Sequence, residues 1–219
     1  MNKKQIIANT EIFVKKTLKN AEGGHDWFHI LRVWNNAKLI AKNESVNLFI
    51  VELGALLHDI ADAKFHDGDE SIGPKIARDF LNKEGVSEEI IQHIENIINY
   101  ISFKSSLTSD GNKFTSPELD VIQDADRLDA IGAIGIARCF NYGGFKNRTI
   151  YDPEIEPNLT MSKEEYKNSQ APTINHFYEK LLLLKDKMNT KTGKQIAADR
   201  HLYMEGFLQQ FYHEWNGEK

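Results

Sequence analysis

The chain has 219 residues, 41% hydrophobic and 27% charged, which is the composition of an ordinary globular protein rather than a disordered or fibrous one. Its formal net charge of −5 argues against broad nucleic-acid binding, so an anionic substrate would need a local cluster of positive charge. No stretch approaches the roughly 20 apolar residues of a membrane span, and no apolar signal region follows the basic start. We therefore expect a cytoplasmic protein that contacts neither a membrane nor nucleic acid stably.

The first two predicted helices contain the first candidate ligand. Residues 5–18 have the pattern of an amphipathic helix, and a second helix begins near Asp26, a plausible N-cap. On that second helix His29, Arg32 and Asn36 lie three and four residues apart, beside the apolar stripe, so they project together. His25 lies four residues before His29 and shares its face if the helix extends that far back.

The third predicted helix, residues 47–61, ends in the adjacent pair His58 and Asp59. Polar groups at the end of an apolar run need partners, which can be either neighbouring hydrogen-bonding groups or a metal ion. Asp62 lies four residues after His58, on the same face if the helix continues to it. Lys64 and His66 follow in a polar loop that is either solvated or placed over a site.

Two further helices are predicted over residues 71–83 and 87–101, separated by Gly85 and with Ser87 as the second cap. His93 on the second of these is interpreted as solvent-facing rather than as a second-metal ligand. Lys104 lies in the loop that follows, and the sequence Ser116-Pro117-Glu118 then has the cap, proline and acidic residue that start a helix.

Helical spacing sorts the aspartates after Ser116. Asp124 and Asp126 point about 200° apart, so they cannot share a site. Val121, Ala125, Leu128 and Gly132 form the expected packed stripe of one continuous helix, with Asp126 beside it and turned inward. Asp124 and Arg127 are expected to form an exposed ion pair.

The pattern lapses over residues 141–172, which include Lys146 and Arg148, either solvated or able to reach a phosphate. Two helices, 173–188 and 191–215, close the chain. The sequence thus predicts an all-α single domain over residues 1–219, with a core at about 20–140, a long loop at 141–172 and C-terminal helices at 173–215. The single cysteine, Cys139, follows an apolar run and is expected to be a buried thiol rather than a nucleophile.

Together His29, His58, Asp59 and Asp126 supply two imidazoles and two carboxylates. Such a mixed nitrogen and oxygen set suits a divalent ion such as Mn²⁺, Fe²⁺ or Mg²⁺ in an open octahedral site better than a structural zinc site. Two coordination positions would remain for water and substrate.

The motifs around these residues resemble the HD-domain superfamily of metal-dependent phosphohydrolases, and more closely the small bacterial single-domain HD hydrolases, some of which are nucleotide pyrophosphohydrolases. The segments that carry the resemblance are His25-Asp26-Trp27-Phe28-His29, Leu56-Leu57-His58-Asp59-Ile60 and Ala125-Asp126-Arg127-Leu128-Asp129.

This resemblance implies that His29, His58, Asp59 and Asp126 bind one divalent metal ion: manganese, magnesium, iron or another transition metal. It also implies that a metal-bound hydroxide attacks phosphorus. Asp62 would orient or deprotonate the water, with Lys64 and Arg32 as the other catalytic candidates. The candidate substrate-binding residues are His25, Lys104, Lys146 and Arg148.

The expected substrate is a small phosphorylated molecule, foremost a nucleotide, with a nucleoside triphosphate giving monophosphate and pyrophosphate as one form of the reaction. A homodimer is compatible with the sequence, which requires none. Two other classes stay open. A di-iron oxygenase on the same fold would need additional ligands such as His66 or His93, and a non-catalytic nucleotide or metal sensor would bind without turnover.

Overall fold

The computed structural model describes residues 2–19, 26–61, 69, 71–101, 114–162, 165 and 168–219. Within these ranges the secondary structure is helical and contains no strand, which confirms the all-α prediction. The chain packs as two compact units, Met1–Asp126, called here the N-terminal unit, and Arg127–Lys219, the C-terminal unit. The single domain predicted over 1–219, with its internal boundaries, stays a prediction.

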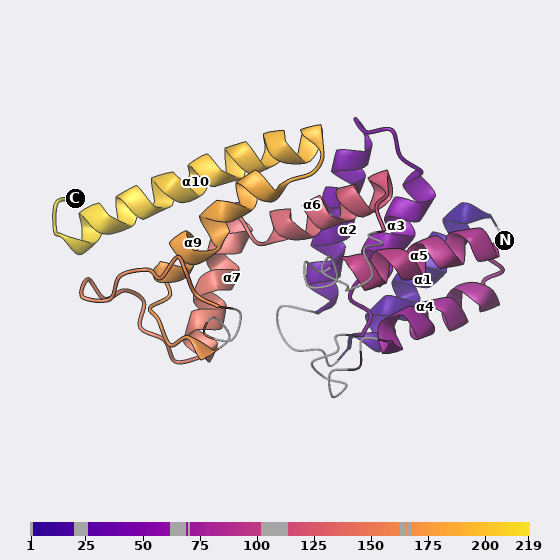
Figure 1. Cartoon of the computed structure of the whole chain (residues 1–219), viewed down its shortest axis with the longest axis horizontal. Helices are drawn as coiled ribbons and strands as arrows, with labels where there is room; N and C mark the ends of the chain where they lie inside the picture. Colours follow the sequence, from indigo (N-terminus) through magenta and orange to yellow (C-terminus); the bar gives the residue numbers. More distant parts are fainter. Residues whose placement is uncertain are drawn as a thin grey trace. The chain divides into compact units, whose positions relative to one another are not determined.

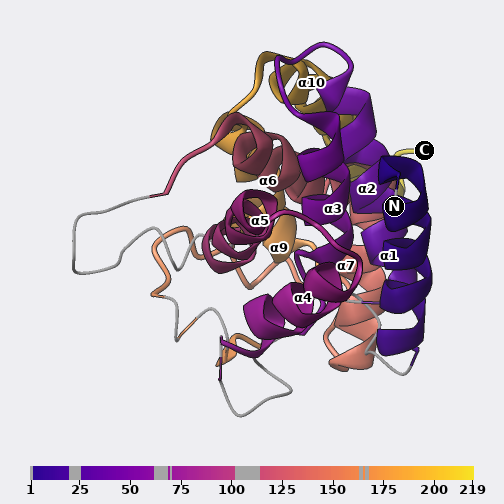
Figure 2. The ribbon, with the colours of Figure 1, turned by 90° about the vertical axis from the view of Figure 1, so that its right-hand side faces the viewer.

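The N-terminal unit is built around one apolar helix, α3. All residues of α3 except Leu48 and Glu52 are buried, as expected of a helix that is apolar on every side. It packs against α1, α2 and α5, and α4 packs on α5 (Figures 1 and 2). The helices of this unit are α1 (Lys3–Thr17), α2 (Trp27–Ala41), α3 (Leu48–Leu57), α4 (Ile72–Lys83), α5 (Glu88–Tyr100) and the first part of α6 (Pro117–Asp129).

Local capping interactions fix several of these helix ends. The Asp26 carboxylate accepts a hydrogen bond from the His29 backbone N–H at 2.9 Å, and the Ser116 hydroxyl accepts one from Leu119 N–H at 3.1 Å. These two predicted caps are confirmed, whereas Ser87 occupies the N-cap position of α5 without a side-chain cap hydrogen bond. Gly85 has a φ of 71°, and Val86 N–H donates to the Leu81 carbonyl at 3.1 Å, which closes α4 as predicted.

Helix α3 ends at Leu57, so the prediction that it continues to residue 61 is wrong. The His58 ring provides the physical reason, because its Nδ1 lies 2.9 Å from the Ala55 carbonyl oxygen. In a continuing helix that carbonyl would accept from Asp59 N–H. The side chain therefore competes with the backbone ladder where the helix stops.

The continuous helix predicted through Gly132 is also wrong, because α6 ends at Asp129 and α7 (Gly132–Phe145) begins after a break. Ile131 is extended and Gly132 has a φ of 74°. Arg200 donates to the Leu128 carbonyl and Arg138 to the Asp129 carbonyl. Both carbonyls would otherwise accept from the next helical turn, so the two arginines stabilise the end of α6.

The C-terminal unit consists of α7, α9 (Asn175–Glu179), the 3-10 helix η3 (Leu181–Lys187) and α10 (Lys191–Trp215) (Figure 1). Helix α10 packs against α7 and η3. Phe140 of α7, Phe177 of α9 and Phe207 of α10 form an aromatic cluster. The rings of Phe177 and Phe207 are stacked, with centroids 5.8 Å apart. No helix in the described ranges is long and apolar enough to cross a membrane.

Helix α7 runs to Phe145, five residues into the segment predicted to be irregular. Near this end α7 packs closely on Thr173, which requires glycine at position 143, because a Cβ there would meet the Thr173 hydroxyl oxygen at 2.2 Å. The Cys139 thiol on the same helix is buried, which raises its pKa to about 12. This confirms the prediction of a buried thiol.

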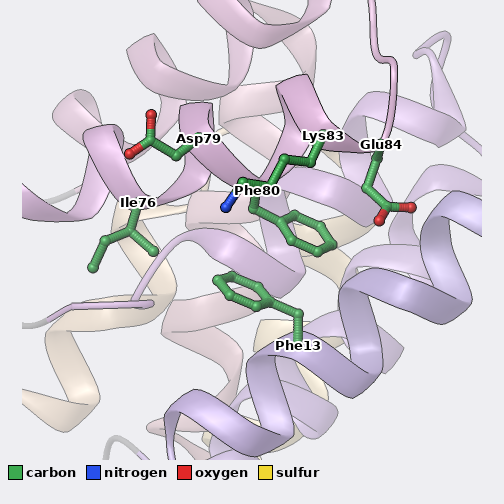
Figure 3. A pocket seen from close by; sticks show the side chains of 6 residues that line it. All are labelled: Phe13, Ile76, Asp79, Phe80, Lys83 and Glu84. Carbon is green, nitrogen blue, oxygen red and sulfur yellow. The ribbon is translucent and has the colours of Figure 1, made fainter.

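A cleft between α1 and α4 contains none of the candidate ligands. Phe13 and Phe80 stack across it with ring centroids 4.2 Å apart, and Asp79, Lys83 and Glu84 also line it (Figure 3). Asn9 of α1 donates to the Glu84 carboxylate at 2.6 Å. We interpret these contacts as the attachment of α1 to α4.

Candidate metal centre

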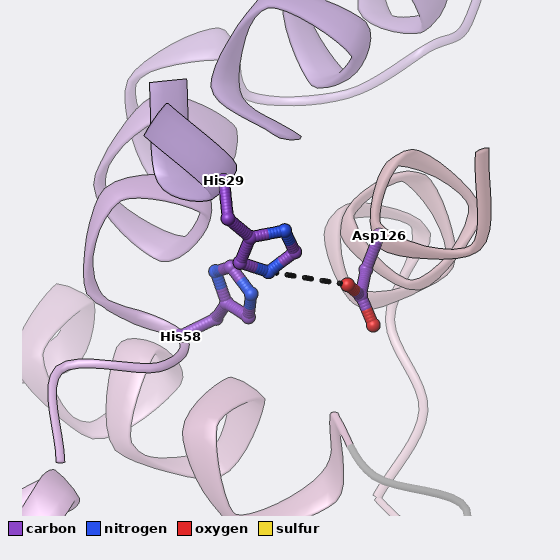
Figure 4. Close-up of side chains that lie close together, drawn as sticks. All are labelled: His29, His58 and Asp126. Carbon is purple, nitrogen blue, oxygen red and sulfur yellow. Dashed lines mark ion pairs between the residues drawn. The ribbon is translucent and has the colours of Figure 1, made fainter. Parts of the chain in front are cut away.

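Two buried histidines from neighbouring helices form the centre of the site. His29 lies in the first turn of α2 and is 3% exposed, and His58 lies at the end of α3 and is 6% exposed. Their ring centroids are 5.6 Å apart, and the rings meet edge to face at 65° (Figure 4). The packing of α2 on α3 therefore brings together residues 29 positions apart in the sequence.

Asp126 of α6 completes the group. One of its carboxylate oxygens lies 3.5 Å from His29 Nε2 (Figure 4). One ligand atom from each of His29, His58 and Asp126 lies within 4.8 Å of the others. The Asp126 side chain is 42% exposed, so the group is closed on the histidine side and open on the carboxylate side.

Two contacts set the position of α6 beside the histidines. Asn36 of α2 donates through its side-chain amide to the Ala125 carbonyl at 3.3 Å, directly before Asp126. A Cβ on Gly54 of α3 would meet Ile122 Cδ1 at 2.5 Å, so this glycine permits the close approach of α6. Of the three residues predicted to project together, His29 and Asn36 both contact α6.

The hydrogen bond of His58 determines which ring nitrogen is available. A backbone carbonyl only accepts, so the contact between Nδ1 and the Ala55 oxygen requires the proton on Nδ1. Nε2 of the neutral ring then carries a free lone pair. This is the usual arrangement of a metal-binding histidine, whose second nitrogen donates to a fixed acceptor.

The donor set fits a divalent ion. Imidazole nitrogen and carboxylate oxygen bind such ions at about 2.1 Å, so two ligand atoms on one ion lie at most about 4.2 Å apart. The ligand atoms of His29, His58 and Asp126 lie up to 4.8 Å apart, which exceeds this distance by well under an ångström. The Asp126 carboxylate is partly exposed and has room to adjust. Two buried imidazoles and one accessible carboxylate leave coordination positions for water and substrate.

The burial of the α6 aspartates differs from the prediction. Asp124 is fully buried, so its predicted place in an exposed pair is wrong, and Arg127 donates to the Lys187 carbonyl at 2.8 Å. Asp126 faces the histidines but remains partly exposed rather than turned into the core. The packed face of α6 is broader than a single stripe, because Ile122 is fully buried as well.

The structure describes only some of the other residues predicted for the site. Asp59 follows His58 directly and is half-buried, but it is not in the group of three convergent ligand atoms. Arg32 is half-buried on α2, one turn after His29. Lys146 and Arg148 lie in the C-terminal unit. The other predicted residues are outside the described ranges: His25, Asp62, Lys64, His66 and Lys104.

His93 has a different role from the one predicted. Its Nε2 lies 3.0 Å from the Ser116 hydroxyl and 3.7 Å from the Glu118 carboxylate, and its side chain is 24% exposed, so a solvent-facing interpretation is wrong. Glu118 also accepts from Asn47 N–H at 2.8 Å. This buried carboxylate therefore joins the starts of α3 and α6, a contact that sequence spacing gave no means to predict.

Comparison with known proteins agrees with this fold. Residues 27–131 match the HD domain. The chain is 37% identical over 202 residues to the uncharacterised protein YpgQ of Bacillus subtilis, with 90% of this chain and 88% of YpgQ covered. It therefore belongs to the HD-domain family, as its three motifs predicted.

Two solved structures cover almost the whole chain. One is an HD-superfamily hydrolase from Bacillus thuringiensis, with 45% sequence identity, a TM-score of 0.79, and 98% of this chain and 99% of that chain covered. The other is Bacillus subtilis YpgQ in complex with ADP, with 33% identity, a TM-score of 0.74, and 98% and 97% covered. The whole chain thus shares its fold with small bacterial HD proteins.

Proposed function

We propose that this protein is a divalent-metal-dependent phosphohydrolase that acts on a small phosphorylated molecule, foremost a nucleotide. The convergence of His29, His58 and Asp126 within 4.8 Å is the observation that carries the proposal. Two histidines this deeply buried, beside an accessible carboxylate, provide the ligands for an ion that keeps open positions.

Four residues would hold the ion: His29, His58, Asp59 and Asp126. His58 would bind through Nε2, because Nδ1 donates to Ala55. The backbone bond to Asp26 holds the start of α2 and with it His29. Asp59, adjacent to His58 in the turn after α3, is the proposed fourth ligand.

A divalent ion bound here would supply a water of lowered pKa and would polarise a phosphate oxygen. The chain's own residues would do the rest. The buried histidine side excludes water, and substrate would approach past the exposed edge of Asp126. We assign Arg32, one turn after His29, and Lys64 to neutralising the phosphate charge, and Asp62 to orienting or deprotonating the water.

A nucleotide substrate is supported by the complex of YpgQ with ADP, a relative that covers nearly all of this chain. We propose a nucleoside triphosphate as substrate, cleaved to monophosphate and pyrophosphate. A single ion per chain is proposed, since His93 binds Ser116 and the described residues that converge as ligands provide one group.

The test compares Mn²⁺-loaded wild type with Asp59→Asn on nucleoside mono-, di- and triphosphates, with phosphate and pyrophosphate measured separately. Loss of a charged metal ligand should lower turnover at least about 100-fold. The matched control is Asp79→Asn, which removes an exposed carboxylate from α4 and should keep wild-type turnover.

Other outcomes would reject particular parts of the proposal. Two irons per chain would favour a di-iron oxygenase, and tight nucleotide binding without product would favour a sensor. Full activity in Asp59→Asn would remove Asp59 from the ligand set. Turnover of phosphate esters but not of nucleotides would retain the phosphohydrolase and reject the nucleotide.

A further inference from the structure

Asn36 shares a helix face with the candidate metal ligand His29. It lies seven residues after His29 on α2, about two helical turns, so the two side chains leave the same side of the helix. His29 is buried and Asn36 is half-buried. The imidazole supplies a ligand atom to the candidate metal centre, whereas the amide reaches the backbone of α6.

The Asn36 amide bonds to the peptide that directly precedes Asp126. Its Nδ2 donates to the carbonyl of the fully buried Ala125 at 3.3 Å. One turn of α2 away from this bond, His29 faces the Asp126 carboxylate, with Nε2 3.5 Å from one of its oxygens (Figure 4). Helix α2 therefore contacts the same short stretch of α6 through both residues.

The start and middle of α6 are attached to a different helix, α3. The Glu118 carboxylate accepts from the Asn47 backbone N–H at 2.8 Å, and a Cβ on Gly54 would come within 2.5 Å of Ile122 Cδ1. These contacts lie eight and four residues before Asp126, so they align the earlier turns of α6 with α3. The attachment to α2 comes next to Asp126 itself.

Asp126 gains from a fixed backbone because its side chain is the most mobile of the three candidate ligands. It is 42% exposed, whereas His29 and His58 are almost fully buried. An exposed carboxylate gives up rotamer freedom when it binds an ion, and freedom of its backbone would add to that loss. A hydrogen bond that fixes the backbone beforehand therefore makes the ion bind more tightly.

We infer that Asn36 is a positioning residue, which holds the backbone of α6 where Asp126 can share a metal ion with His29. This role rests on the proposed function, because it takes His29, His58 and Asp126 as ligands of one divalent ion. Asn36 acts through Asp126 and is not itself a ligand. An amide suits the role, since it donates to a carbonyl and carries no charge that would compete for the ion.

Titration calorimetry of Mn²⁺ into the metal-depleted full chain tests this role. Asn36→Leu keeps the approximate size of the side chain but removes the donor, and it should weaken Mn²⁺ binding about threefold to tenfold, the usual effect of one lost hydrogen bond. Asn35→Leu removes the same amide from an exposed position of α2 and should bind Mn²⁺ as wild type does. Without metal, both variants should melt within about 4 °C of wild type.

Two further readouts separate positioning from a general loss of stability. If Asn36 acts through Asp126, Asn36→Leu should have almost no further effect on Mn²⁺ affinity in a chain that already carries Asp126→Asn. In turnover assays Asn36→Leu should need about threefold to tenfold more Mn²⁺ for half its maximal rate. At saturating Mn²⁺ that maximal rate should lie within about twofold of wild type.

Three results would overturn this role for Asn36: wild-type Mn²⁺ affinity in Asn36→Leu, equal weakening in Asn35→Leu, or an undiminished effect of Asn36→Leu in the Asp126→Asn chain. In all three cases wild type still binds Mn²⁺, so the proposed phosphohydrolase stands. If wild type itself binds no Mn²⁺, the metal centre is rejected and the role of Asn36 is rejected with it.

Discussion

Two regions place polar side chains in buried surroundings in different ways. In the C-terminal unit the Asp129 carboxylate, 1% exposed, is bound by the Arg138 guanidinium, and Arg200 adds positive charge nearby. In the N-terminal unit, His29 and His58 converge with Asp126, and all three offer ligand atoms. In the first region an arginine of the chain itself neutralises the buried carboxylate. In the second, the grouped side chains have the ligand atoms to bind an added metal cation.

The difference separates a structural role from a binding role. Arg138 and Arg200 also bind the last carbonyls of α6, so their interactions serve the helix junction. Asp26 accepts from the His29 backbone N–H, and the Ala55 carbonyl accepts from His58 Nδ1, so Nε2 of His58 is the nitrogen that can bind an ion. We therefore expect substitutions in the first region to change stability, and those in the second to change metal binding.

The largest effect is expected from Arg138→Met. It keeps much of the side-chain volume but removes the cation from a carboxylate that is almost fully buried. The free energy of unfolding should fall by about 3 kcal/mol. Denaturant unfolding followed by circular dichroism measures this, with Lys194→Met on exposed α10 as the control, expected within about 0.5 kcal/mol of wild type. Equal stability of the two variants would show that the pair contributes nothing.

The next effect concerns metal-dependent stability. His58→Gln should unfold within about 1 kcal/mol of wild type when both are metal-free, because it loses one hydrogen bond. With Mn²⁺ at about 100 times the wild-type dissociation constant, wild type should gain about 2.7 kcal/mol and the variant much less. Thermal unfolding with and without Mn²⁺ measures both quantities. An undiminished gain in His58→Gln would remove this residue from the metal centre.

The smallest effect is expected at Gly54, where α3 packs against α6 close to the candidate metal centre. Gly54→Ala would place a methyl group against Ile122, one turn before Asp126, and should cost about 1 to 2 kcal/mol while weakening Mn²⁺ binding by displacing α6. Gly206→Ala on α10 meets open space and should stabilise the chain by about 0.5 to 1 kcal/mol. Unchanged Mn²⁺ affinity in Gly54→Ala would mean that α6 adjusts without moving Asp126.

Local signals in the sequence predicted much of this fold. Asp26 and Ser116 are caps whose side chains bond within three residues, so their effect is visible in the order of residues alone. The motifs around His29, His58 and Asp126 also predicted which residues converge. Asp59, by contrast, stays a prediction, since its adjacency to His58 does not fix the direction of its side chain.

The failures arise from interactions that helical periodicity does not describe. The end of α6 depends on Arg200, 72 positions after Leu128, and no local pattern contains that contact. The end of α3 depends on the His58 ring bonding to its own helix, which is a choice between two local structures. The burial of Asp124 depends on how much of α6 is covered, and periodicity alone underestimated it.

The bond between His58 and the Ala55 carbonyl also matters for protein engineering. The same bond ends a helix and fixes the ring of a proposed metal ligand, so a design that transplants the His-Asp motif must carry the preceding turn of α3 with it. Placed in mid-helix, the ring would lose its acceptor and its fixed tautomer. Attempts to change metal preference should therefore begin at Asp126, whose accessible carboxylate has no part in ending its helix.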